Sequence, residues 1–205
     1  TNKESIMRSA LFACLTAVVV FLPIESRAAD WVIDASHSSV SFKVRHMMVT
    51  NVRGEFGTFS GEISYDPKNP AKTTAKVSID ASSIDTNDEK RDGHLRSPDF
   101  FDTAKFATIT FDSTKAKTSG KNGLEVHGKL TMRGVTKPVV LEVEDITNEV
   151  NDPWGNTKIG ATLTTTINRQ DFGVSWNKAL DKGGVVVADE VKITIDLELN
   201  KKKSK

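Results

Sequence analysis

The chain has 205 residues, with 28 basic and 27 acidic side chains and a net charge of +1. This balance lacks the basic surplus with which nucleic-acid-binding proteins contact phosphates, so we expect no nucleic-acid partner. Hydrophobic residues make up 38% of the chain, which suffices for one core.

Residues 1–28 are predicted to be a cleaved signal peptide. Arg8 supplies a positive charge, residues 10–24 form an apolar run, and Ser26-Arg27-Ala28 fits the small-x-small cleavage pattern. The run is shorter than the roughly 20 residues of a spanning helix, so we expect no stable membrane span after cleavage and a secreted, periplasmic location. Cys14 is the only cysteine and lies in this run. The mature chain must therefore be stable without disulfides.

The mature chain is predicted to be all-β. Apolar and polar side chains alternate along eight segments, which is typical of antiparallel strands with one buried face. These segments are residues 40–46, 52–66, 75–79, 106–111, 124–132, 139–144, 159–167 and 191–199. A sandwich or an up-and-down barrel would hide both the apolar faces and the strand edges. An eight-stranded barrel can also hold one small ligand in its lumen.

Residues 86–96 are predicted to be the one helix. Thr86 and Glu89 fit a capping box, and Pro98 disfavours helix at Ser97. A helix this polar cannot supply a core. It is expected to lie across the end of the barrel.

The anchors of this helix are expected to be Leu95, Phe100 and Phe101. Arg91 and His94 share a face with Leu95 through i, i+3 and i+4 spacing. That face is predicted to make polar contacts with a ligand. The alternating charges of residues 88–96 fit a solvated helix face equally well.

The histidines form no recognisable metal or catalytic pattern. His127 has the outward parity of its strand, and His37 fits a turn or hydrogen-bonding residue. His46 and His94 lie on separate elements without H-x-x-x-H spacing. Asp34 has the chemistry to orient a histidine, but nothing in the sequence places it next to one. Since no G-x-S-x-G motif occurs either, we predict no metal ligands, no catalytic residues and no enzymatic activity.

Eight short motifs, in order along the chain, resemble the signature of the YceI-like family. They are Trp31-x-x-Asp34-x-x-His37-Ser38, Phe42-x-Val44-x-His46-Met47, Val52-Arg53-Gly54-x-Phe56, Arg91-Asp92-Gly93-His94-Leu95-Arg96-Ser97-x-Asp99-Phe100, Gly128-x-Leu130-Thr131, Thr136-Lys137-Pro138-Val139, Asp152-Pro153-Trp154-Gly155 and Ile167-Asn168-Arg169-x-Asp171-Phe172-Gly173. The resemblance covers Trp31 to Leu199. It implies one YceI-like barrel domain over residues 29–200, followed by a basic tail at 201–205.

The resemblance also implies a fold and a ligand. The fold is an antiparallel, eight-stranded, lipocalin-like barrel with one short helix near its mouth. The ligand is a polyisoprenoid or similar long-chain lipid, such as a prenyl diphosphate or a quinone tail, held in an apolar tunnel. A periplasmic location in a bacterium and a homodimer are implied as well. No cofactor is implied beyond such a bound isoprenoid or quinone-like lipid.

Two sets of residues are predicted to bind the ligand. The tunnel wall is predicted to contain Phe42, Val44, Phe59, Ile63, Val77, Phe106, Phe111, Leu130, Leu163 and Ile193. The mouth and the polar end are predicted to contain Arg53, Arg91, His94, Arg96 and Trp176. Inward apolar residues of this kind are more often simple core than ligand wall, and the pattern alone does not separate the two. In the filled-core alternative the chain is a non-catalytic β-domain that binds a partner in a structural or stress-related role.

Overall fold

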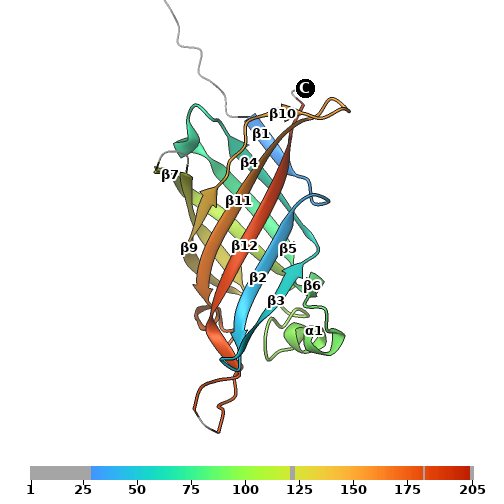
Figure 1. Ribbon diagram of the computed structural model, residues 1–205, viewed down its shortest axis with the longest axis vertical. Helices are drawn as coiled ribbons and strands as arrows, with labels where there is room; N and C mark the ends of the chain where they lie inside the picture. Colours follow the sequence, from blue (N-terminus) through green and yellow to red (C-terminus); the bar gives the residue numbers. More distant parts are fainter. Residues whose placement is uncertain (1–28, 121–122, 182, 204–205) are drawn as a thin grey trace, which may run out of the picture.

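The computed structural model describes residues 29–120, 123–181 and 183–203. The predicted signal peptide and the last two residues of the predicted tail lie outside them. This part of the chain forms a β-barrel with one α-helix at one end, shown at the bottom of Figure 1. No helix among these residues combines the length and apolar character that a membrane crossing requires.

The strands and helices follow in chain order. The strands are β1 (Ala29–Ile33), β2 (Ser39–His46), β3 (Thr50–Phe56), β4 (Phe59–Tyr65), β5 (Thr74–Asp80), β6 (Ile84–Asp85), β7 (Thr108–Ser119), β8 (Gly123–Met132), β9 (Val135–Glu144), β10 (Val150–Asn151), β11 (Thr157–Asn168) and β12 (Val187–Lys201). The helices are α1 (Glu89–Arg96) and the 3₁₀ turns η1 (Pro70–Lys72), η2 (Ala81–Ser83) and η3 (Arg169–Phe172).

Eight strands close the barrel, which confirms the predicted fold class. They pair in the order β11-β9-β8-β7-β5-β4-β1-β12, and β12 pairs again with β11. All of these pairings are antiparallel. Along one edge of β12, Leu199 to Lys201 pair with β1 and Val187 to Asp196 pair with β2. β3 and β6 then continue the wall from β2, so the barrel is longer on this side.

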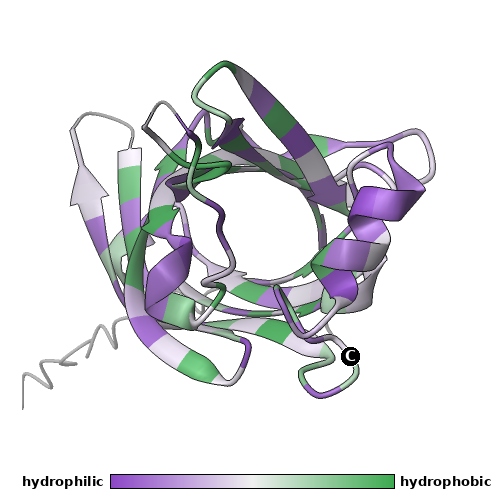
Figure 2. Ribbon diagram, turned by 90° about the horizontal axis from the view of Figure 1, so that it is seen from below, coloured by the Kyte–Doolittle hydropathy of each residue, from purple (hydrophilic) through white to green (hydrophobic). Residues whose placement is uncertain are grey.

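Alternation along the strands decides which side chains face inward. On β12 the apolar side chains of Val191, Ile193 and Ile195 line the interior, while Lys192 and Asp196, which have the opposite parity, are exposed. Figure 2, viewed along the barrel from the end that carries α1, shows this alternation of apolar and polar residues around the ring of strands. The interior is therefore apolar because successive residues of a strand point to opposite faces.

One end of the barrel is filled by Trp31, and we call it the Trp31 end. Trp31 is fully buried and packs with Ile63, Ile159 and Leu199. The ammonium of Lys201 lies 5.3 Å from the centre of the Trp31 ring and pairs with a carboxylate. Lys201 is also the last residue of β12, so the strand extends one residue into the predicted tail.

The opposite end, which we call the helix end, carries α1, which lies beside the ring of strands in Figure 2, and several loops. α1 ends at Arg96, as predicted, but its N-cap is Asp88, whose carboxylate accepts from the N–H of Arg91 at 3.0 Å. The predicted capping box is therefore wrong. Thr86 is buried and donates its N–H and hydroxyl to the carboxylate of Asp92 instead. This pair ties the helix to the strand end before it.

Candidate functional site

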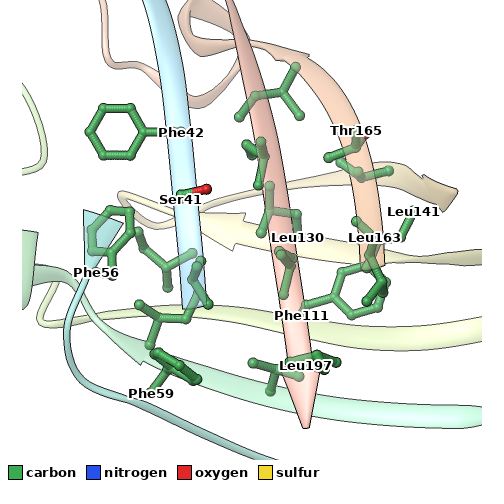
Figure 3. Close-up of a pocket in the computed structure, with 18 of the residues that line it drawn as sticks. Ser41, Phe42, Phe56, Phe59, Phe111, Leu130, Leu141, Leu163, Thr165 and Leu197 are labelled. Carbon is green, nitrogen blue, oxygen red and sulfur yellow. The ribbon is translucent and has the colours of Figure 1, made fainter. Parts of the chain in front are cut away.

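The barrel contains a cavity of about 240 Å³ that runs along its axis. Its wall extends from Thr73 and Leu199, near the Trp31 end, to Leu95 and Arg169 at the helix end. In Figure 3, labelled side chains such as Phe59, Phe111 and Leu163 converge on it from different strands. Since nearly all the wall is hydrocarbon, the cavity fits an apolar ligand.

Nine of the ten residues predicted for the tunnel wall line this cavity. They are Phe42, Val44, Phe59, Ile63, Val77, Phe111, Leu130, Leu163 and Ile193. Their contact with a ligand stays a prediction.

Phe106 is not among the residues that line the cavity. β7 begins only at Thr108, so strand alternation does not extend to position 106. The ring of Phe106 packs beside the β8–β9 turn, where a Cβ added at Gly134 would lie 2.6 Å from Cε1 of Phe106. The ammonium of Lys105 lies 5.1 Å from the centre of the same ring.

Three aromatic rings form a wall section near the helix end. The centres of Phe42 and Phe56 are 5.9 Å apart, and Phe56 meets Phe101 edge to face at 5.8 Å. Phe42 stands opposite Gly54, where a Cβ would lie 2.6 Å from Cζ of Phe42. Only a glycine leaves room for the ring in this position. Leu95, Phe100 and Phe101 also line the cavity, which confirms them as the anchors of the helix segment.

Several wall residues were not predicted, although most share the inward parity of those that were. They include Val40, Phe56, Val126, Leu141, Val143, Ala161, Ile195 and Leu197. Alternation would have identified nearly all of them. Ala161 is notable because its small side chain leaves space that a larger residue would fill.

Arg169 had no predicted role and is the only charged residue on the described wall. It is 4% exposed. Its guanidinium donates to the carbonyls of Val174, Trp176, Val187 and Ala188 at 2.6, 2.9, 3.2 and 2.9 Å, and to Asp189 Oδ1 at 3.3 Å. Burial lowers the pKa of Arg169, and the Asp189 carboxylate opposes this shift. Arginine still stays charged, so it brings a positive charge to the helix end of the cavity while holding the loop before β12.

Two of the predicted mouth residues are engaged within the helix segment. The guanidinium of Arg91 donates to the hydroxyl and the carbonyl of Thr86, both at 2.7 Å. That of Arg96 donates to the carbonyls of Ser82 and Ile84, also at 2.7 Å. Both arginines therefore fasten α1 to the barrel, and any role at a ligand's polar end stays a prediction.

The other three predicted mouth residues occupy two places. His94 and Trp176 lie together at the helix end, with ring centres 5.1 Å apart. Both contact Phe100, a wall residue, at 5.0 and 5.3 Å, so they lie one layer behind the cavity. Arg53 lies on the outer face of β3, because Val52 and Gly54 on either side of it face inward.

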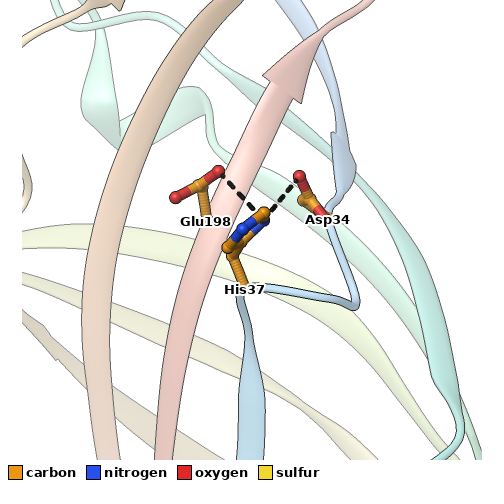
Figure 4. Close-up of side chains that lie close together, drawn as sticks. All are labelled: Asp34, His37 and Glu198. Atoms are coloured by element: carbon orange, nitrogen blue, oxygen red, sulfur yellow. Dashed lines mark hydrogen bonds and ion pairs between the residues drawn. The ribbon is translucent and has the colours of Figure 1, made fainter. Parts of the chain in front are cut away.

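A polar network lies outside the barrel near the Trp31 end. His37 Nδ1 lies 3.2 Å from Asp34 Oδ2 and 3.6 Å from Glu198 Oε1 (Figure 4). His37 is thus confirmed as a hydrogen-bonding residue, and the structure places Asp34 beside a histidine, which the sequence did not reveal. Bonds from the Ser36 hydroxyl, then from Lys158, His37 and others, hold the pKa of Asp34 well below its usual range despite some burial.

These three residues also have the ligand types of a metal site. Lys158 Nζ, however, lies 2.6 Å from Glu198 Oε1 and 3.1 Å from Asp34 Oδ2. An ammonium already balances both carboxylates, and their hydrogen bonds raise the pKa of Lys158. The group therefore fits a surface ion network that joins the β1–β2 turn to β11 and β12.

Comparison with known proteins identifies the family. The YceI-like domain matches residues 31–199, which is most of the chain. The chain belongs to the YceI-like family. Curated relatives include UPF0312 proteins of Vibrio parahaemolyticus, 42% identical over 170 residues (82% of this chain, 89% of the relative), and of a Shewanella species, 41% identical over 173 residues (83% and 90%).

Solved structures resemble the fold of this YceI-like chain. Burkholderia cenocepacia BcnA matches with a TM-score of 0.71 at 28% identity, over 81% of this chain and 98% of BcnA. The Campylobacter jejuni YCEI protein matches with a TM-score of 0.64 at 31% identity, over 83% and 97%. A polyisoprenoid binding domain from Saccharophagus degradans matches with a TM-score of 0.61 at 18% identity, over 85% and 99%, which supports the shared fold.

Proposed function

We propose that this YceI-like chain is a non-catalytic carrier or store that holds one long isoprenoid or related amphiphilic lipid in its barrel. The observation that carries the proposal is the continuous apolar cavity along the barrel axis. The description of the Saccharophagus degradans domain as polyisoprenoid-binding supports this ligand class. The predicted signal peptide supports a periplasmic location, where such a lipid is insoluble unless a protein shields it.

The shape of the cavity favours a single extended chain. The wall follows β12 from Val187 to Leu199. With a rise of about 3.4 Å per residue and a strand tilt of about 40°, this stretch spans about 30 Å along the axis. That is about twice the depth of one bilayer leaflet, roughly 15 Å. A volume of about 240 Å³ over this length makes a narrow channel, which suits a linear chain better than a compact ligand.

The polar end of the ligand is expected at the helix end. Arg169 supplies the one charge on the described wall there, and His94 and Trp176 lie just behind it. The five N–H groups of Arg169 are already used within the protein, so it would attract an anionic or polar group by charge rather than by a new hydrogen bond. The Trp31 end is filled, so it suits the apolar tail.

Burial energies indicate what limits the ligand. Each buried CH₂ contributes about 0.8 kcal/mol, so a five-carbon isoprene unit would add about 3–4 kcal/mol before ordering costs. Five units would already approach the ceiling of about 18–21 kcal/mol for noncovalent binding. The length of the cavity, rather than affinity, would therefore select the length of the chain.

Native mass spectrometry of the protein purified from the periplasm, followed by lipid extraction, tests the proposal. A bound species with isoprene-unit mass increments, or another long-chain amphiphile, is expected. The variant Ala161→Phe is expected to fill the cavity, so that the bound lipid is no longer detected. Thr164→Phe, on the outer face of the same strand, is expected to retain the bound lipid. A protein that carries no lipid and takes up neither a polyprenol nor a quinone would overturn the proposal and favour the partner-binding alternative.

A further inference from the structure

The β2–β3 turn exposes three consecutive apolar side chains at the helix end of the barrel. Met47, Met48 and Val49, which we call the apolar tip, are 44%, 54% and 76% exposed. Val49 donates its N–H to the carbonyl of His46 at 3.0 Å and closes the turn. Large apolar residues in sequence at a protruding turn are unfavourable in water, which suggests that this turn meets another phase or surface.

The turn geometry does not explain these residues either. Met47 and Met48 have φ angles of 50° and 60°, in the left-handed region. Glycine and asparagine adopt this conformation with least strain, and tight hairpins favour them for that reason. Both the backbone and the solvent therefore favour Asn-Gly here over Met-Met.

A row of cations crosses the outer face of the strands that lead to the apolar tip, at Lys43, four residues before Met47. Lys192 on β12 pairs in register with Lys43 on β2, which pairs with Arg53 on β3. All three lie on the outer face, and none forms an ion pair or side-chain hydrogen bond with another described residue. Like charges directly opposite each other destabilise a sheet. This set, which we call the basic row, is thus not explained by the stability of the barrel.

From these two features we propose that the apolar tip and the basic row form a docking site for the surface of an anionic lipid bilayer. Apolar side chains that enter the headgroup region and cations that face anionic headgroups are the two contributions to peripheral membrane binding. An anionic bilayer accounts for both features at once, since a purely apolar partner would leave three unpaired cations at its edge.

The docking site adjoins the helix end of the cavity. Met47 donates its N–H to the carbonyl of Val186 at 2.8 Å, and the next residue, Val187, lines the cavity. Docking would place this end of the cavity against the membrane, so that a lipid could pass between them. This use of the site rests on the proposed function; the docking itself does not.

The opposite end of the barrel offers a useful contrast. Trp154 is 81% exposed there, and Val150 is 58% exposed. The cations beside them, Lys158, Lys201 and Lys202, each form an ion pair with a carboxylate. Because the cations that adjoin this exposed apolar turn are already paired with carboxylates, they attract anionic lipid less than the unpaired basic row does, so we assign the docking site to the helix end.

Cosedimentation with vesicles tests the proposal. The full mature protein is mixed with vesicles of equal parts phosphatidylglycerol and phosphatidylcholine, or of phosphatidylcholine alone. Binding is expected to the anionic vesicles only, and to weaken as salt is added, because salt screens exposed charges.

Two sets of substitutions separate the two features. Replacing the basic row by Lys43→Gln, Arg53→Gln and Lys192→Gln is expected to weaken binding about 100-fold. Replacing the apolar tip by Met47→Asn, Met48→Gly and Val49→Thr is expected to weaken it about tenfold. The tip variant should fold at least as well as the original chain, because its residues suit the turn.

Matched controls lie at the Trp31 end. The triple change Lys68→Gln, Lys72→Gln and Lys76→Gln removes the same charge, and Val150→Thr with Trp154→Ser removes apolar side chains from the other exposed turn. Both are expected to bind vesicles like the original chain. Equal losses in these controls, or no binding to anionic vesicles, would overturn the proposal. A concentration-dependent dimer that disappears in the tip variant, without vesicle binding, would assign the tip to an interface between copies.

Lipid content distinguishes this proposal from the proposed function. Native mass spectrometry of the basic-row variant reports whether the cavity is still occupied, independently of docking. Vesicle binding by a protein with an empty cavity would support docking and count against the carrier. A lipid-loaded protein that does not bind vesicles would support the carrier and count against docking.

Discussion

The ring of Phe111 on β7 packs directly against Gly128 on β8. A Cβ at Gly128 would lie 2.3 Å from Cζ of Phe111 and 2.8 Å from the carbonyl oxygen of Asp112. Phe111 also lines the cavity, so the absence of a side chain at Gly128 decides where this ring stands.

Gly128→Ala is therefore expected to displace the Phe111 ring and to lower the free energy of unfolding by about 1–3 kcal/mol, as overpacking does. Urea denaturation measures the loss. Gly160→Ala is the control, because the nearest atom to its new Cβ lies at 3.4 Å, and it should change stability by less than about 0.5 kcal/mol. Adding Phe111→Leu to Gly128→Ala should recover part of the loss. No recovery would mean that the clash with the Asp112 carbonyl dominates.

Arg169 should be irreplaceable by lysine. Lysine carries the same charge, but its single nitrogen cannot reach carbonyls on both the 174–176 segment and the start of β12. Arg169→Lys is expected to lower the free energy of unfolding by about 2–4 kcal/mol, because buried carbonyls lose their donors. Hydrogen exchange should speed up in residues 173–188. The exposed Arg53→Lys is the control, and a similar loss there would contradict the assigned role.

The attachment of α1 should depend on Asp92 rather than Glu89. Asp92 is 5% exposed and accepts both bonds from Thr86. Asp92→Ala is expected to cost about 1–3 kcal/mol of unfolding free energy, since it leaves the Thr86 donors buried without an acceptor. Glu89→Ala should cost less than about 0.5 kcal/mol. A larger loss for Glu89→Ala would restore the capping box that the sequence predicted.

Asp34 should make stability depend on pH in the acid range. Its folded-state pKa is held below the ordinary value of 3.8, first by the Ser36 hydroxyl and then by Lys158 and His37. As the pH falls, Asp34 is therefore protonated in the unfolded chain before it is protonated in the folded protein. The contribution of Asp34 to the free energy of unfolding is complete above pH 3.8 and decreases as the pH falls below it. Asp34→Asn lacks this contribution. The difference in unfolding free energy between the two proteins should narrow below pH 3.8, and a difference independent of pH would refute the assignment.

Alternation by itself identified nine residues of the cavity wall. Positions such as Phe42, Leu163 and Ile193 were predicted correctly to face inward, because a strand that buries one face must direct every second side chain to that side. This local rule does not require knowledge of the partner strand. It failed at Phe106, which lies just outside β7.

Contacts between segments distant in the sequence were decided only by the tertiary structure. Arg169 meets carbonyls up to 19 residues away, and Arg96 reaches back to Ser82 across 14 residues. The basic row exists only because β12 pairs with β2 in a particular register, which brings Lys192 next to Lys43. The alternation along each strand reflects which side chains avoid water. That preference depends on the residue type, so it can be read from the sequence alone. Register and loop path decide which acceptor a buried donor reaches and which cations become neighbours. Both are set by the whole barrel as it closes.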